Sequence, residues 1–359
     1  MNERRYPSLE GLRFLASLAI VLYHFVPYTE RGRTSAEFWS GQFSIAVDLF
    51  FVISGIVIAN GYIGRISNWR EYCEFVRRRL ARLYPLHLAT LGFYVVVGAA
   101  ASAGLVSVVK ESKYAFSELW SNLLLVHAWG FSSQLSFNYV SWSISAELFV
   151  YLLFPLIAWM ATRPSGLIAV GAVLAASITI SHSWIGRSLP HLTWDYSILR
   201  ALPSFSLGVW ICANRNLVIN VVGLRRAAAG LAFSVVLLAM LMAVGSSEYA
   251  LLGAVYCIVV FAFLCDVGQL RTPLAWDPIS RLGILTYSIY MLHPLVATVL
   301  LSFLAPRLLG TSFWATVAAI GAAIAVTFGA AVLSYRWFEE PARQMLTSSP
   351  RGLRLAQQR

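Results

Sequence analysis

The chain has 359 residues, of which 58% are hydrophobic and only 12% are charged, and its mean hydropathy is +0.70. Soluble domains carry about 25% charged residues, so this composition excludes an ordinary soluble protein and indicates a polytopic helical membrane protein. The formal net charge of +11 does not indicate nucleic-acid binding, because the excess basic residues lie mainly between apolar runs.

Ten apolar runs are predicted to span the membrane, so the expected fold is an all-α bundle of about ten transmembrane helices. The expected spans are 11–28, 43–63, 84–106, 139–161, 166–182, 197–213, 227–244, 249–266, 283–305 and 312–336.

Arginines mark every second loop between these spans. They lie before the first span, after the second, fourth, sixth and eighth spans, and in the tail: Arg4, Arg5, Arg65, Arg70, Arg77, Arg78, Arg79, Arg82, Arg163, Arg215, Arg225, Arg226, Arg271, Arg281, Arg343, Arg351, Arg354 and Arg359. Cytoplasmic loops carry an excess of Lys and Arg, so an even number of spans predicts that both termini are cytoplasmic. We expect a membrane domain over residues 1–345 and a short basic cytoplasmic tail over 346–359.

The segment 119–130, "LWSNLLLVHAWG", is apolar but too short to span the membrane. Counting it as a span would invert every later loop against the distribution of arginines. It is therefore predicted to be a re-entrant or interfacial helix on the outer side of the membrane.

Three ionisable side chains are predicted to share one layer in the outer half of the membrane. His24, Asp48 and Glu147 lie in the first, second and fourth spans. Counted from the outer surface at roughly 1.5 Å per residue, their depths are about 6, 8 and 12 Å. A lone membrane His often only hydrogen-bonds a neighbouring helix, but Asp and Glu inside spans are by default functional candidates. Together they predict a polar site.

His293 has two interpretations. Pro294 follows it, so His293 either lies at a helix kink with a capped carbonyl or belongs to the polar site. Ser143, in the stretch "SWSISAE" beside Glu147, carries little weight alone, because serines are common small packing residues in spans.

The stretch "RRRLARLYP", residues 77–85, also has two interpretations. Arg79 and Arg82 are three residues apart and share a helix face. One interpretation is that they anchor the cytoplasmic end of the third span to lipid phosphates. The other is that they clamp an anionic cofactor together with Arg13, which lies near the same surface at the start of the first span.

Six blocks occur in an order that points to a known family. Arg13 and His24 enclose ten residues in the first span. Five further blocks follow: "VDLFFVISG" (47–55), "RRLARLYP" (78–85), "SWSISAELFVYLLFP" (141–155), "LGILTYSIYMLHP" (282–294) and "SYRWFEEPAR" (334–343). In this order they resemble the signatures of the acyltransferase-3 family of integral membrane O-acyltransferases, over about residues 6–345.

The resemblance implies about ten membrane helices and transfer of an acyl group, commonly acetyl from acetyl-CoA, to a hydroxyl. Family acceptors are often sugars of surface polysaccharides, and others are macrolides and related natural products. Arg13 and His24 match the family's essential pair, Arg79 and Arg82 match the arginine motif associated with acyl-CoA, and Glu147 matches an acidic motif residue. Many polysaccharide-modifying members carry an extra extracytoplasmic esterase-like domain, and the sequence is expected to be a single-domain member without it.

The expected chemistry follows from the ionisation of the two groups that must react. An acceptor hydroxyl is nearly unionised at pH 7, so its attack on a thioester needs a base, which His24 can supply. Asp48 or Glu147 is expected to orient the imidazole. Arg13, Arg79 and Arg82 are expected to bind acetyl-CoA, and no metal is expected. The residues expected at the substrate are Trp142, Ser143, Tyr287 and His293.

The expected partners are acyl-CoA, a carbohydrate or lipid-linked sugar acceptor, and membrane lipids, with no nucleic acid. The expected location is a bacterial inner or plasma membrane. The rival from another class is a proton-coupled secondary transporter, since buried His, Asp and Glu also build proton relays. Transfer from labelled acetyl-CoA would mark the enzyme, whereas uptake into liposomes would mark the transporter.

Overall fold

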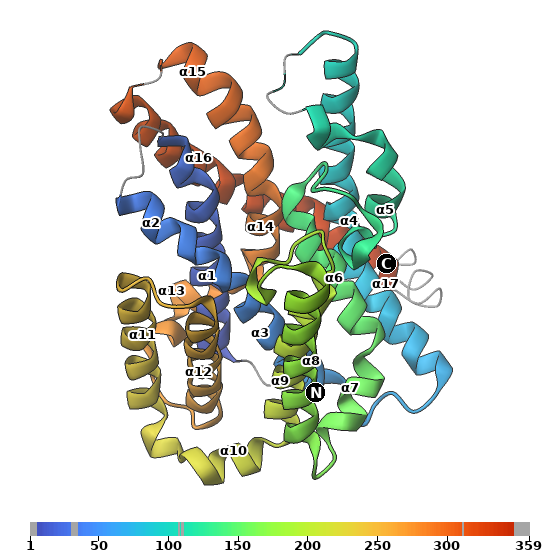
Figure 1. Cartoon of the computed structure of the whole chain (residues 1–359), viewed down its shortest axis with the longest axis vertical. Coiled ribbons are helices and arrows are strands. Elements are labelled where there is room, and N and C mark those ends of the chain that lie inside the picture. The colour runs from blue at the N-terminus through green and yellow to red at the C-terminus, as the bar shows by residue number, and fades with distance from the viewer. Residues whose placement is uncertain (1–5, 30–34, 107, 109–110, 311, 348–359) are drawn as a thin grey trace, which may run out of the picture.

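A computed structural model describes residues 6–29, 35–106, 108, 111–310 and 312–347 of the chain. Every regular element in these residues is helical, which confirms the predicted all-α fold. Most long helices run roughly along the vertical of Figure 1. The helices are α1 (Pro7–Phe25), α2 (Ser35–Gly41), α3 (Ala46–Tyr62), α4 (Trp69–Ser102), α5 (Leu119–Leu123), α6 (Trp142–Leu152), α7 (Phe154–Ala161), α8 (Gly166–Ile180), α9 (Ile198–Ala213), α10 (Arg215–Val222), α11 (Ala227–Ala243), α12 (Glu248–Val267), α13 (Asp277–Ser280), α14 (Thr286–Val296), α15 (Ala305–Leu308), α16 (Phe313–Ser334) and α17 (Glu340–Thr347).

The predicted spans all correspond to helices in the described residues. Eight helical segments there are long and apolar enough to cross a membrane: Pro7–Thr29, Phe38–Tyr62, Trp69–Ser102, Gly166–Ile185, Leu224–Ala243, Glu248–Val267, Asp277–Leu308 and Phe313–Thr347. Two bent pairs raise the number to ten, namely α6 with α7, bent by 63°, and α9 with α10, bent by 83°. The protein is therefore a multi-pass membrane protein. The cytoplasmic position of both termini stays a prediction, and residues 1–5 and 348–359 lie outside the described part.

The third span begins well before its predicted start at residue 84. The side chain of Asn68 accepts a hydrogen bond from the Glu71 backbone N–H at 3.0 Å and so caps the N-terminus of α4. The arginine-rich stretch is thus the first part of a 34-residue helix. Arg79 and Arg82 consequently lie on one helix face, as their spacing predicts.

The segment 119–130 forms the short helix α5 and the start of the turn η5 (His127–Phe131), and it is not among the candidate spans. Its polar backbone is paired with neighbouring helices. The Ser145 hydroxyl of α6 donates to the Leu125 carbonyl at 2.7 Å and accepts from the Ala128 N–H at 3.1 Å. Non-helical backbone at membrane depth needs such partners. Its depth in the membrane stays a prediction.

Helices α3 and α9 pack with their backbones in contact at the centre of the bundle. A Cβ atom on Gly55 would lie 2.2 Å from the Phe205 carbonyl oxygen. A Cβ on Gly208 would lie 2.0 Å from the Val52 carbonyl oxygen. Only glycine fits at either position, as at other close helix crossings in membranes.

Candidate active site

A cavity of about 590 Å³ runs along α3, between α4, α6 and α14. Its lining extends on α3 from Tyr62 to Val47, which is about four helical turns or roughly 22 Å. Arginines of α4 and α17 surround the Tyr62 end. Near the other end the lining includes Phe50 and Tyr290, whose ring centres are 6.2 Å apart. The cavity therefore has one cationic end and one neutral end.

Arg79 and Arg82 line the cationic end, where the cofactor was expected. The Arg79 guanidinium lies 5.4 Å from the centre of the Tyr62 ring, and that of Arg82 lies 5.3 Å from the centre of the Tyr287 ring. The Arg79 Nε is buried and has no hydrogen-bond partner among the described residues. No carboxylate among the described residues forms an ion pair with Arg79 or Arg82. Such donors are suited to an anion.

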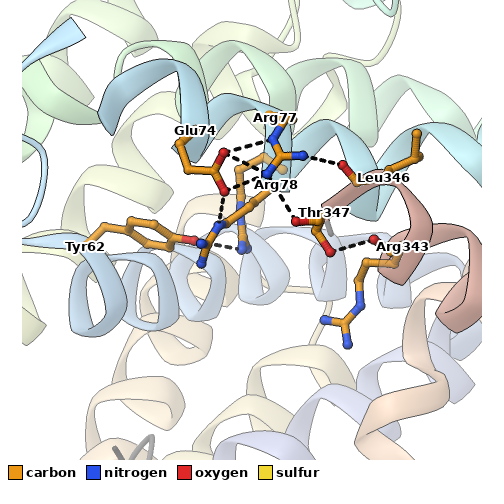
Figure 2. A network of polar contacts seen from close by, with 8 residues as sticks. Tyr62, Glu74, Arg77, Arg78, Arg343, Leu346 and Thr347 are labelled. Carbon is orange, nitrogen blue, oxygen red and sulfur yellow. Dashed lines mark hydrogen bonds and ion pairs between the residues drawn. The ribbon is translucent and has the colours of Figure 1, made fainter. Parts of the chain in front are cut away.

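The C-terminal helix α17 closes one side of this end through an ionic network, shown in Figure 2. Arg77 donates to the carbonyl oxygens of Leu346 and Thr347 at 2.6 and 3.1 Å. These carbonyls end α17 and lack partners inside the helix, and a cation there is favourable. Glu74 holds Arg77 and Arg78 in place at 2.8 and 2.7 Å. The docked helix supplies three side chains that line the cavity: Arg343, Gln344 and Thr347.

Two more of the predicted residues, Arg13 and Glu147, also line the cavity. Arg13 is paired with Glu10, one turn away on α1, at 3.3 Å. One carboxylate oxygen of Glu147 accepts hydrogen bonds from the Ser54 hydroxyl at 2.7 Å and from the Tyr151 hydroxyl. Glu147 was expected to orient His24, but among the described residues its hydrogen bonds are with Ser54 and Tyr151 and none is with His24. It faces the cavity.

Asp48, the other expected orienting group, forms a buried ion pair with Arg200 of α9. The Arg200 Nε lies 3.1 Å from both Asp48 oxygens, and its Nη2 lies 2.6 Å from Oδ2. The Arg200 side chain is 3% exposed and that of Asp48 is 1% exposed. Arg200 also donates to the Ser44 carbonyl at 3.0 Å and lies 5.2 Å from the centre of the Trp142 ring. Trp142 thus lies against the Asp48–Arg200 pair, and neither Asp48 nor Trp142 lines the cavity.

His24 pairs with His293 of α14. Its Nδ1 is 3.0 Å from the His293 Nε2 and 3.0 Å from the Ile20 carbonyl oxygen. The His293 Nδ1 is 3.2 Å from the Ile289 carbonyl oxygen, so this nitrogen carries the proton and Nε2 accepts. The His24 Nδ1 faces two acceptors and must donate. The lone pair of His24 is therefore on Nε2, the form that a general base needs.

The histidine pair lies next to the neutral end of the cavity. The Tyr290 ring centre is 5.9 Å from that of His293, one turn along α14. The Tyr290 hydroxyl accepts from the Ser143 hydroxyl at 2.8 Å and donates to the Val140 carbonyl at 3.0 Å. Ser143 and Tyr287, both expected at the substrate, line the cavity, with Tyr287 at the arginine end.

Several residues of this region were not among the predicted site residues. Arg200 lies inside an apolar span, so the argument that singled out Asp48 could have found it too. The others carry no comparable signal, because serines and tyrosines are ordinary residues of membrane helices: Ser54, Tyr151 and Tyr290.

Comparison with known proteins gives the family. A family model described as an acyltransferase domain matches residues 6–336. Acyltransferase MdmB of Streptomyces mycarofaciens is 33% identical over 162 residues, which are 42% of this chain and 39% of that protein. O-acetyltransferase OatA of Staphylococcus aureus is 30% identical over 168 residues, which are 44% of this chain and 25% of that protein. No solved structure matches.

A third relative is similar over a longer part of the chain. The putative membrane-bound transacylase BcsY of Komagataeibacter xylinus is 27% identical over 317 residues, which are 81% of this chain and 72% of that protein. The first two alignments span less than half of MdmB and OatA. The family model, in contrast, matches nearly the whole chain, and the protein therefore belongs to the acyltransferase-3 family.

Proposed function

We propose that the protein is an O-acyltransferase that moves an acyl group from acyl-CoA to a hydroxyl of a carbohydrate. Acetyl is the proposed acyl group, which the name of the O-acetyltransferase relative favours. The proposed acceptor belongs to an exopolysaccharide or another cell-surface glycan, the common acceptors of the family. The observation that carries the proposal is a histidine pair beside the neutral end of a cavity whose other end is lined by arginines.

In this proposal the cofactor lies along α3. Its phosphates bind the guanidinium groups of Arg79 and Arg82, which have no carboxylate partner in the described residues. Its slim pantetheine arm follows the cavity toward Tyr290, and Glu147 accepts a hydrogen bond from an amide N–H of the arm. The thioester then lies near Ser143 and the histidine pair.

The transfer step uses His24 as the general base. The hydroxyl oxygen of the acceptor attacks the thioester carbonyl carbon while the His24 Nε2 takes its proton. The tetrahedral intermediate then breaks its C–S bond, and the proton passes from His24 to the leaving thiolate. The products are an ester and the free thiol of coenzyme A. His293 keeps its hydrogen bond to the His24 Nδ1–H, which orients the ring and stabilises the imidazolium.

The proposed orientation places the arginine end of the cavity in the cytoplasm, where acyl-CoA is made, in a bacterial inner or plasma membrane. Single cysteines test it in a protein whose four native cysteines are replaced. Arg215→Cys should resist a membrane-impermeant thiol reagent in intact cells, and His191→Cys, at an exposed position of the opposite side, should react. Labelling of the cysteine at 215 from outside would contradict the orientation.

The activity is tested with purified protein in lipid nanodiscs. We expect ¹⁴C-acetyl-CoA to yield labelled glycan in a surface-polysaccharide preparation, with one thiol released for each acetyl transferred. Saturable uptake of a solute into proteoliposomes, with no thiol release, would instead identify a transporter. Mass spectrometry of surface glycans and secreted metabolites from a deletion strain would name the acceptor and reveal a macrolide-like one.

A further inference from the structure

The turn η3 (Glu111–Tyr114) carries a lysine into a group of aromatic rings. The Lys113 Nζ lies 4.6 Å from the centre of the Tyr94 ring, 5.1 Å from that of Tyr139 and 5.9 Å from that of Tyr114. Its ammonium forms no ion pair with any carboxylate whose side chain the structure describes. A cation in this place is attracted by the faces of the rings.

Lys113 is half-buried, and an ammonium that loses part of its hydration without a counter-ion is costly. Burial lowers the pKa of Lys113 from its usual value to about 8. The side chain is still mainly protonated at pH 7, so the positive charge persists beside the rings. Cation–π attraction offsets only part of the cost. An anion that bound here would complete the compensation.

The lysine lies close to the proposed general base. The Tyr139 ring, whose centre is 5.1 Å from the Lys113 Nζ, has its centre 5.1 Å from that of His24 as well. The ammonium and the imidazole therefore lie within two such distances of each other, on either side of one ring or closer. Two groups of one sugar can bridge a separation of this size.

Lys113 is also held in place. Its carbonyl oxygen accepts from the Phe137 N–H at 2.7 Å. Tyr114, the next residue, packs in a small apolar cluster with Leu91, Tyr94 and Phe137. The turn follows the end of α4 that is opposite its arginines, and Lys113 does not line the cofactor cavity. The phosphates of the cofactor therefore do not account for it.

We propose that Lys113 binds an anionic group of the acceptor, a carboxylate or a phosphate, while a hydroxyl of the same sugar faces His24. This inference rests on the proposed function and narrows its substrate to acidic or phosphorylated glycans. The charge of Lys113 would select the acceptor and fix its orientation.

The experiment measures glycoside binding to the full-length protein in nanodiscs by saturation-transfer NMR. The probes are methyl β-D-glucuronide against methyl β-D-glucoside for a carboxylate, and glucose 6-phosphate against glucose for a phosphate. We expect the wild-type protein to bind one anionic probe about 10–100-fold more tightly than its neutral counterpart, the range for one charged hydrogen bond. Whichever anionic probe is preferred identifies the group.

Lys113→Met should remove this preference and leave binding of the neutral sugars unchanged, whereas Lys113→Arg should keep most of it. Arg307→Met is the matched control, because Arg307 is an exposed cation that lies against Phe303. A wild-type protein that binds neither anionic probe more tightly than its neutral counterpart overturns the proposal. So does a Lys113→Met variant that weakens neutral and anionic probes equally.

Two further readings separate this inference from the proposed function. Normal binding of coenzyme A without any preference for anionic sugars overturns the role of Lys113 alone. A preference that depends on Lys113, in protein that releases no thiol from acetyl-CoA, overturns the transferase alone.

Discussion

Two polar pairs join distant parts of the chain in different ways. Asp48 and Arg200 carry opposite charges, and the five hydrogen bonds of the Arg200 guanidinium go to Asp48 and to backbone carbonyls. His24 and His293 are linked by one hydrogen bond, and each also bonds a carbonyl of its own helix. The charges of the ion pair are compensated by each other, whereas the histidine pair leaves the basic Nε2 of His24 without a hydrogen bond inside the pair.

The difference shows when an ionisable group inside a membrane protein is structural and when it can react. A buried charge is tolerated once its partner compensates it fully, and it then has no capacity left for a substrate. A neutral pair with one spare lone pair can still accept a proton. On this view Asp48–Arg200 ties α3 to α9, and α1 and α14 hold the proposed general base between them.

The largest expected effect separates the pairs by activity. His24→Gln keeps a polar side chain but cannot shuttle a proton, so acetyl transfer should fall by about 10²–10⁴-fold. Coenzyme A binding and thermal stability should stay at the wild-type level. His182→Gln is the control, since His182 lies outside the cavity and bonds Tyr249. Substantial transfer by folded His24→Gln protein would remove His24 from the mechanism.

The second effect distinguishes the two pairs by their contribution to the stability of the fold. Asp48→Leu or Arg200→Met alone leaves an uncompensated buried charge and should cost about 3–5 kcal/mol. The double variant Asp48→Leu with Arg200→Met removes both charges and should regain most of the loss. Unfolding followed by intrinsic fluorescence in detergent measures this. Single variants that unfold like the wild-type protein would show that the pair does not bear on the fold.

The third effect concerns the cationic end of the cavity. Arg79→Lys keeps the charge but loses the planar fork, so coenzyme A should bind about 10–100-fold more weakly. Titration calorimetry with coenzyme A measures this, and Arg281→Lys, an exposed arginine paired with Asp277, is the control. Wild-type affinity in both Arg79→Ala and Arg82→Ala would make these arginines membrane anchors only.

A smaller effect is expected from His293, the partner of the proposed general base. His293→Leu removes one of the two acceptors that face the His24 Nδ1–H and leaves only the Ile20 carbonyl, so the transfer rate should fall roughly 3–10-fold, the worth of one hydrogen bond. His293→Gln offers a carbonyl oxygen in its place and should retain more activity. Steady-state rates at saturating acetyl-CoA compare the two. Equal rates in both variants would show that His293 does not orient His24.

The smallest effect concerns α17. Arg77→Ala removes a cation from the C-terminal carbonyls of this helix, which is worth about 0.3–1 kcal/mol. Coenzyme A affinity should drop a few-fold at most, because α17 supplies part of the cavity lining. Arg226→Ala, on the α10–α11 connection, is the matched control. The same calorimetric titration decides, and an unchanged affinity would show that docking of α17 does not affect the cofactor.

The spans could be predicted from the sequence because each must be long and apolar whatever its neighbours are. The bend between α6 and α7 also left a signal, since Pro155 follows the break by two residues. The early start of α4 did not follow from hydropathy, because its first turns are charged and lie outside the apolar run.

The site was only partly predictable. Counting residues from a span's end gives the depth of a side chain but not the face of the helix on which it lies. His24, Asp48 and Glu147 could therefore be placed in one layer, yet they face α14, α9 and the cavity, respectively. The spacing of Arg79 and Arg82 was a stronger guide, because two residues three apart in one helix must share a face.

The contact of α3 with α9 at Gly55 and Gly208 limits how the cavity can open. Two backbones in van der Waals contact, tied further by a compensated ion pair, cannot slide or part without losing both. The α3 wall of the cavity is thus fixed. Any motion that widens the cavity must therefore come from its other walls, α4, α6, α14 and α17. We expect exchange of the proposed cofactor to follow the mobility of these helices.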